Sequence, residues 1–283
     1  MREHGPGWAV VVPVRGGPLA KSRLDLPMGT REVLADAFAR DTVAALLASG
    51  AVGDVLVVTG DAEVATWASG TGAQVVDDPS GGLDAAVAAG VSAAVAAGPR
   101  DVAVVLGDHP ALRAEEVDTA LAAADGHGRA VLPDLDGTGT ALLTMRSATT
   151  PGPTAFGPGS AGAHAGMGHT VLHLDVPGLR TDVDDAASLA RATLLGLGAA
   201  TRAALGRATL PGVQATIHRV EDDGSGAALL DDGVEVVVPP GAAEASGLRH
   251  LRVGQRVSVE LDEAGRAATR VWIVGIGPGE TIR

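Results

Sequence analysis

The chain has 283 residues, of which 46% are hydrophobic and only 2% are aromatic, so its core must consist mainly of Val, Leu and Ala. The formal net charge of −13 argues against broad binding to nucleic acids or anionic membranes, because both require a cationic protein face. The absence of cysteine excludes disulfides and thiolate metal sites. No apolar run reaches the roughly 18 residues that span a bilayer, and residues 1–7 lack a signal-peptide core, so we expect a cytoplasmic protein.

The first predicted element is a strand over residues 8–14 that runs into a loop rich in glycine, proline and cationic side chains. The loop carries four side chains that can contact phosphate, namely Arg15, Lys21, Ser22 and Arg23. Lys21 is the only lysine among the 21 Lys and Arg residues of the chain. Glycine-bearing loops after strands hold phosphate through backbone N–H groups and fixed charges, which favours a phosphate site. A basic surface loop after an edge strand is the alternative.

Strands and helices alternate over the first 125 residues. Further strands are predicted at 54–59, 73–76 and 102–106, and helices at 31–49, 61–69 and 83–97. The alternation predicts parallel βαβ units with right-handed crossovers. Ligands of such sheets bind at the carboxyl ends of the strands, where the loops 15–24, 77–84 and 107–110 begin. We therefore expect these three loops to converge in space.

The regular alternation of predicted strands and helices ends after residue 126. Strands are predicted at 129–132, 140–145 and 170–174, and a final helix at about 184–197. We expect a break between the two parts of the chain near residues 198–207.

Short β runs separated by turn residues follow this break. They are predicted at 213–219, 227–230, 234–238, 256–261 and 268–274. Such a series predicts a small all-β barrel. We therefore divide the chain into an α/β domain, residues 1–206, and a barrel domain, residues 207–283.

Two acidic motifs follow strands of the α/β domain. Asp108 comes directly after an apolar strand, where a carboxylate is well placed to hold Mg²⁺. A cap for a helix that starts near Leu112 is the alternative role of Asp108. Asp182 and Asp184 are two residues apart, so they share one side of an extended segment. Asp184 or Asp185 as a helix N-cap is the alternative. Together with a cationic phosphate loop, the motifs indicate metal-assisted chemistry on a nucleoside triphosphate.

The histidines show no metal-ligand spacing tied to a carboxylate motif. The four nearest the acidic and glycine-rich motifs are His109, His164, His169 and His173. His164 lies on a predicted short helix after Ser160 and could contact a substrate. A surface position is the favoured interpretation of His164.

Residues 8–200 resemble the CofC/FbiD family, the phosphoenolpyruvate or 2-phospho-L-lactate guanylyltransferases of coenzyme F420 synthesis. The motifs that carry the resemblance are Val12–Arg15, Ala20–Leu24, Gly82–Asp84, Gly107–Pro110, Asp136–Thr140, Phe156–Ser160 and Asp182–Asp184. The resemblance implies a glycosyltransferase-A-like nucleotidyltransferase fold, in which a mostly parallel sheet is flanked by helices. It also implies GTP as the nucleotide, a three-carbon phosphorylated acid as the acceptor, and Mg²⁺ as the cofactor.

The same resemblance assigns roles in nucleotide binding. Lys21 and Arg23 would hold the GTP triphosphate and act in catalysis, with Arg15 and Gly16 beside them. Asp84 would lie near the guanine. The family usually has Lys where Arg15 stands, which keeps the charge but changes its shape. It usually has Asn where Asp84 stands, although a carboxylate can still accept from the guanine N1–H and amino groups.

The metal and the acceptor would be held further along the chain. Asp108, Asp182 and Asp184 would bind Mg²⁺, and Asp108 would be catalytic. The acceptor phosphate and carboxylate would be held by Thr140, Gly157 and Ser160. Because the acceptor phosphate is anionic near pH 7, it needs no general base. Catalysis then consists of bringing two polyanions together and stabilising the departing pyrophosphate.

Residues 212–275 resemble a cold-shock-type OB domain, a family that binds single strands by stacking bases on aromatic side chains. The segments expected to carry these rings, 225–230 and 236–238, contain none, and the region has more acidic than basic residues. Nucleic-acid binding is therefore disfavoured. A packing role, a homo-oligomer contact or a relic without a ligand is the preferred interpretation.

The leading hypothesis is a GTP:phosphoenolpyruvate guanylyltransferase. The Ala-, Arg- and Gly-rich composition suggests the bacterial branch of the family, which is why phosphoenolpyruvate is preferred to 2-phospholactate. Another nucleotidyltransferase, acting on a sugar phosphate or molybdopterin, is an alternative, but the Leu-Ala-Gly-Gly loop that usually opens such chains is missing. A nucleic-acid-binding protein that uses the OB domain is the alternative from a different class.

Overall fold

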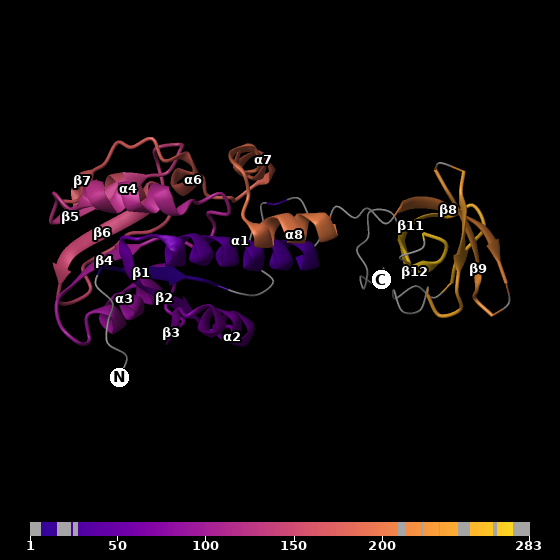
Figure 1. Cartoon of the computed structure of the whole chain (residues 1–283), viewed down its shortest axis with the longest axis horizontal. Helices are drawn as coiled ribbons and strands as arrows, with labels where there is room; N and C mark the ends of the chain where they lie inside the picture. The colour runs from indigo at the N-terminus through magenta and orange to yellow at the C-terminus, as the bar shows by residue number, and fades with distance from the viewer. Residues whose placement is uncertain are drawn as a thin grey trace. The chain divides into compact units, whose positions relative to one another are not determined.

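The computed structural model describes residues 7–15, 24, 28–208, 213–221, 223–231, 233–242, 250–262 and 265–273. The chain forms two compact units, residues 1–204 and 205–283 (Figure 1). Within the described ranges, no helix is both long and apolar enough to cross a membrane.

The first unit is built on a sheet that has seven strands among the described residues, in the order β3-β2-β1-β4-β6-β5-β7. The strands are β1 (Trp8–Pro13), β2 (Val52–Thr59), β3 (Gln74–Asp77), β4 (Arg100–Val104), β5 (Arg129–Pro133), β6 (Thr140–Ala148) and β7 (Thr170–Val171). The strands β1 to β4 pair in parallel, β5 and β7 also pair in parallel, and β6 runs antiparallel to both β4 and β5. The predicted mostly parallel α/β architecture is confirmed. The last strand is shorter than the predicted 170–174.

Helices cover both faces of this sheet (Figure 1). They are α1 (Met28–Ala48), α2 (Ala62–Thr71), α3 (Leu83–Ala94), α4 (Ala114–Ala124), α5 (Ser160–Gly166), α6 (Pro177–Arg180), α7 (Ala186–Leu195) and α8 (Ala199–Ala208). Val10 and Val12 of β1 pack in one core with side chains of α1, α2 and α4, whereas Val11 packs on the opposite face with α3. Gly90 lets α3 lie close to the sheet, because a Cβ there would collide with Val11. The continuous buried run of β1 follows from this two-sided cover.

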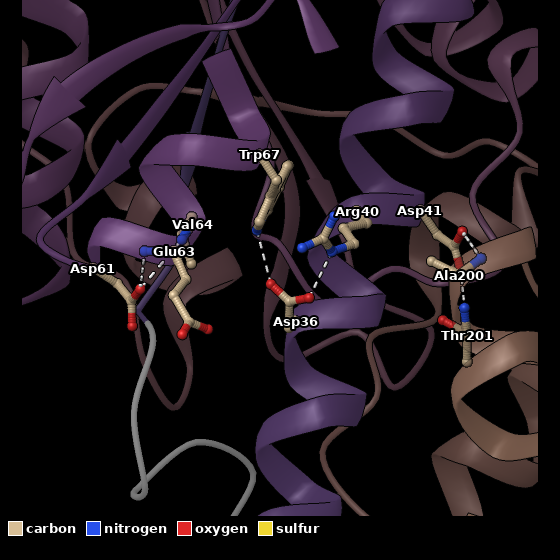
Figure 2. Close-up of polar contacts among 9 residues, drawn as sticks. All are labelled: Asp36, Arg40, Asp41, Asp61, Glu63, Val64, Trp67, Ala200 and Thr201. Atoms are coloured by element: carbon tan, nitrogen blue, oxygen red, sulfur yellow. Dashed lines mark hydrogen bonds and ion pairs between the residues drawn. The ribbon is translucent and has the colours of Figure 1, made fainter. Parts of the chain in front are cut away.

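Helix α8, which we did not predict, occupies the segment of the expected break, and the division between the two units falls within that segment, after residue 204. Its start is fixed by Asp41 of α1, whose carboxylate accepts the backbone N–H groups of Ala200 at 2.9 Å and Thr201 at 2.8 Å. Figure 2 shows this cap beside a second contact of α1, in which Asp36 accepts the indole N–H of Trp67 at 2.8 Å. Asp41 is buried, and its two charge-assisted hydrogen bonds satisfy backbone donors at the start of α8 that have no partner within the helix.

The second unit is an antiparallel sheet with five strands among the described residues, in the order β10-β9-β8-β11-β12. Its strands are β8 (Val213–Val220), β9 (Gly226–Leu230), β10 (Glu235–Val238), β11 (Arg256–Leu261) and β12 (Ala268–Ile273). In β10, Val236 and Val238 are buried whereas Glu235 and Val237 are exposed, as expected for a strand with one buried face. A bridge between Val237 and Ala267 joins β10 to the segment before β12, so the sheet curls upon itself.

Candidate active site

Three carboxylates meet beyond the carboxyl end of β4. Asp108 follows this strand, Asp182 and Asp184 precede α7, and one oxygen of each lies within 4.8 Å of the others. The backbone N–H of Val183 donates to the carbonyl of Asp108 at 2.9 Å, which ties the two segments together. Val183 is fully buried, so its two acidic neighbours project to the other side of the extended chain, where Asp108 lies.

Helix caps do not explain these carboxylates. The start of α4 is capped by Glu116, whose carboxylate accepts the backbone N–H of Arg113 at 3.2 Å. Asp108 is therefore not the cap of that helix. The start of α7 is capped by Asp185, which accepts the backbone N–H of Ser188 at 2.8 Å. The cap alternative for Asp108 is therefore wrong, whereas the N-cap alternative is confirmed for Asp185, which lies outside the cluster.

The cluster concentrates negative charge. Burial, followed by the neighbouring charges of Asp108 and Asp184, raises the pKa of Asp182 to about 6. Three hard oxygen donors that repel one another are a suitable environment for a divalent cation, which would replace the repulsion by attraction. The chemistry of the donor set therefore fits Mg²⁺.

The predicted phosphate loop is described only in part. Lys21, Arg23 and Gly16 lie outside the described residues, while Arg15 is exposed directly beyond β1. The neighbouring Val14 lies against the loop after β4, because a Cβ on Gly107 would be 3.1 Å from its side chain. The ends of β1 and β4 thus reach the same edge of the sheet, as the parallel order predicts.

Asp84 lies at the start of α3 and holds a loop of the acceptor region. Its Oδ1 accepts the hydroxyl of Thr154 at 2.6 Å and the backbone N–H of Phe156 at 3.1 Å. The side chain is exposed, and Oδ2 makes no hydrogen bond within the described part of the chain. Because Oδ1 of Asp84 holds the loop, its Oδ2 is available to accept a hydrogen bond from another partner.

The predicted acceptor residues lie around α5. Thr140 is the first residue of β6, Ser160 is the first residue of α5, and both are buried, with 7% and 2% of their surface exposed. Gly157 is exposed in the turn before α5. Its φ of +130° is a backbone conformation that residues with a side chain rarely adopt. The backbone N–H of Ala161 donates to the carbonyl of Thr138 at 3.1 Å and joins α5 to the segment before β6.

Sequence reasoning placed His164 at the surface, and this prediction is wrong because the side chain is fully buried. Its Nδ1 lies 2.9 Å from Oγ1 of Thr140, and its Nε2 accepts the backbone N–H of Ala155 at 3.0 Å. On α5 the buried residues Ser160, Ala161 and His164 share one face through i, i+3 and i, i+4 spacing. That spacing was the available signal for the burial of His164.

Asp134 is a second residue that sequence reasoning missed. Its carboxylate accepts the backbone N–H groups of Thr138 at 2.9 Å and Gly139 at 2.7 Å, and so shapes the turn that leads into β6. Gly139 is required there because a Cβ would collide with the Asp134 carboxylate. Arg180 donates to the carbonyls of Asp134 at 2.8 Å and Pro133 at 3.1 Å, which anchors the same turn near the Asp182 segment.

The first unit is similar to known nucleotidyltransferases. The MobA-like NTP transferase domain family matches residues 30–173, all within the first unit. The phosphoenolpyruvate guanylyltransferase of Geodermatophilus obscurus is 46% identical over 212 residues, which cover 72% of this chain and 96% of that protein. The namesakes from Streptomyces coelicolor and Salinispora arenicola are 46% and 48% identical, and 99% and 94% of their lengths are covered. The chain therefore belongs to the family of MobA-like nucleotidyltransferases that includes the phosphoenolpyruvate guanylyltransferases.

Proposed function

We propose that this enzyme transfers GMP from GTP to phosphoenolpyruvate and releases pyrophosphate, as a step in coenzyme F420 biosynthesis. The meeting of Asp108, Asp182 and Asp184 at the end of β4 is the observation that carries the proposal, because nucleotidyl transfer needs a cation between two polyanions. The names and near-complete coverage of the similar enzymes support the choice of GTP and phosphoenolpyruvate.

The three carboxylates would hold Mg²⁺. When bound, the ion would supply electrostatic neutralisation of phosphate oxygens on the nucleotide and the acceptor. The carboxylates themselves restrict where such a cation can sit, because Asp108 is fixed through its backbone to Val183.

In the proposed reaction, a phosphate oxygen of phosphoenolpyruvate attacks the α-phosphorus of GTP. A bond forms between them, and the bond from the α-phosphorus to the oxygen that bridges to the β-phosphate breaks, which gives enolpyruvyl-2-diphospho-5'-guanosine and pyrophosphate. No proton has to be removed from an acceptor phosphate that is already ionised. Lys21 and Arg23 would stabilise the charge that develops on pyrophosphate, and Arg15 would extend this cationic surface.

The test is pyrophosphate release by the full chain with each of GTP, ATP and CTP, combined with phosphoenolpyruvate, 2-phospholactate or mannose 1-phosphate. We expect release with GTP and phosphoenolpyruvate, and its loss when EDTA removes divalent cations. Release with 2-phospholactate but not with phosphoenolpyruvate would show that 2-phospholactate is the acceptor. Release with only the sugar phosphate, or with neither three-carbon acid, would overturn the proposal.

For the second unit we propose an OB-like domain, which the curled antiparallel sheet supports. It would serve packing or homo-oligomer formation rather than nucleic-acid binding, because the sequence of its described strands contains one Trp, Trp272, and no Phe or Tyr. Light scattering of the full chain tests oligomer formation. Titration with labelled single strands tests nucleic-acid binding, and binding that persists at 150 mM salt, the physiological level, would contradict the proposal. A cytoplasmic location also stays a prediction.

A further inference from the structure

His164 has both ring nitrogens engaged although it belongs to none of the roles assigned above. The ring is fully buried, and the rings of Phe156 and His169 pack against it edge-on at centroid distances of 5.0 and 5.7 Å. One nitrogen contacts Thr140 on β6, and the other contacts the backbone of Ala155. The imidazole thus joins β6, the strand that begins at Thr140, to the loop before α5.

The contact with Ala155 decides the tautomer of the ring. A backbone N–H can only donate, so Nε2 of His164 must present its lone pair, and the proton of the neutral ring lies on Nδ1. Nδ1–H therefore donates to Oγ1 of Thr140 across the 2.9 Å contact. Burial, then the charge of His169, lowers the pKa of His164, which keeps the ring neutral at pH 7.

This assignment fixes the role of the Thr140 hydroxyl. Because its oxygen accepts from the imidazole, its own proton must point away from His164 toward a different acceptor. Within the described part of the chain the Thr140 hydroxyl makes no second hydrogen bond. A carboxylate or phosphate oxygen is the natural partner of such an oriented O–H donor.

We propose that His164 is a positioning residue that directs the hydroxyl proton of Thr140 toward an anionic oxygen of the three-carbon acceptor. The inference rests on the proposed function, since it takes Thr140 as an acceptor-binding residue. The same ring reaches the nucleotide side indirectly, because the residues flanking Ala155, namely Thr154 and Phe156, donate to Asp84. The main effect of His164 is nevertheless on the KM of the acceptor, because only Thr140 receives its proton.

The tautomer can be measured without any substrate. Nitrogen-15 NMR of histidine-labelled full-length protein distinguishes a ring protonated at Nδ1 from one protonated at Nε2. We expect the Nδ1–H form for His164, with assignment from the spectrum of His164→Asn. An Nε2–H ring, or a charged ring at pH 7, would overturn the proposal whatever the enzyme's substrate.

Two substitutions separate the two bonds of the ring. His164→Asn places an amide N–H near the Nδ1 position and keeps the donor to Thr140, whereas His164→Gln places an amide oxygen near the Nε2 position and keeps only the acceptor for Ala155. Loss of an oriented hydrogen bond to an anion corresponds to roughly a tenfold change. We expect His164→Gln to raise the KM of phosphoenolpyruvate about tenfold, with the KM of GTP unchanged, and His164→Asn to remain within about threefold of wild type.

The double variant shows whether His164 acts through Thr140. In a Thr140→Val background, His164→Gln should cause no further rise in the acceptor KM. Thr144→Val is the matched control, because Thr144 is buried on the same strand and its hydroxyl donates to the carbonyl of Ala130. Equal KM values for the Asn and Gln variants, or additive effects with Thr140→Val, would overturn the role of His164 while leaving the reaction intact. No pyrophosphate release by wild-type enzyme with either three-carbon acid would overturn the reaction and this inference together.

Discussion

Replacing Asp182 by Asn should make the metal-free protein more stable and the enzyme inactive. In the folded chain the pKa of Asp182 is raised from 3.8 to about 6 by burial and by the charges of Asp108 and Asp184. A group with a raised pKa favours the folded state at low pH, and this contribution is lost as the pH rises through the folded pKa. The ionised carboxylate therefore destabilises the fold above about pH 6, and the amide of Asn removes that cost.

The magnitude follows from the shift. About two pKa units at 1.36 kcal/mol each give an upper value of about 3 kcal/mol, and screening by water at this half-buried side chain reduces it to about 1 to 2 kcal/mol. Coulomb's law gives the same scale, since two charges about 4.8 Å apart at an effective dielectric constant of about 20 repel by about 3.5 kcal/mol.

Urea unfolding in EDTA measures the effect. We expect the free energy of unfolding of Asp182→Asn to exceed that of wild type by about 1 to 2 kcal/mol at pH 8, with the difference vanishing near pH 4. Adding Mg²⁺ should stabilise wild type but not the variant. Asp185→Asn is the control, because the pKa of Asp185 is lowered by its hydrogen bonds to Ser188 and its substitution should not stabilise the protein. An Asp182→Asn variant that is no more stable than wild type at pH 8 would refute the reasoning.

Three further predictions concern individual side chains. Asp108→Asn should lower kcat at least about 100-fold, and His109→Gln less than tenfold, because only the former removes a charge from the cluster; steady-state pyrophosphate release with comparable losses would contradict this. Asp41→Ala should lower the free energy of unfolding by about 3 kcal/mol, and Asp41→Asn by about half as much, since two buried N–H donors lose their partner; a urea midpoint shift equivalent to less than about 0.5 kcal/mol would exclude this cap. Asp84→Ala should reduce the preference for GTP over ITP about tenfold, as measured by kcat/KM, whereas Thr154→Val should leave it unchanged; equal ratios for both variants would remove Asp84 from the guanine site.

The sheet of the first unit was predictable because its signal is local. The β-branched run of β1 and the strand-helix alternation up to residue 125 both follow from two-sided burial, which the structure shows. Helix α8 was not predictable in the same way. The glycine at position 198 reads as a break, and the helix depends on Asp41, which lies far away in the sequence. When the capping residue belongs to another helix, the sequence of the capped segment does not contain the signal for its own start.

The candidate site divides in a similar way. Asp108 and the pair at 182 and 184 were expected together, because strand ends of a parallel sheet share an edge. His164 was misplaced, because α5 has only seven residues and few large apolar side chains to mark its buried face. Its partners come from β6 and from the loop at 155, so the burial is a tertiary effect.

The groups that surround each aspartate, more than its position in the sequence, distinguish helix-capping carboxylates from those of the acidic cluster. Asp61 and Asp185 each precede a helix and accept a backbone N–H at 2.8 Å, which stabilises the start of that helix. Asp182 lies a few residues before the same helix as Asp185, yet its pKa is raised because the nearest strong influences are burial and two other carboxylates. A fold that retains such a repulsive group loses stability unless a cation is bound. The opposite directions of these two pKa shifts, three residues apart, therefore agree with the cap that Asp185 forms and with the ligand role proposed for Asp182.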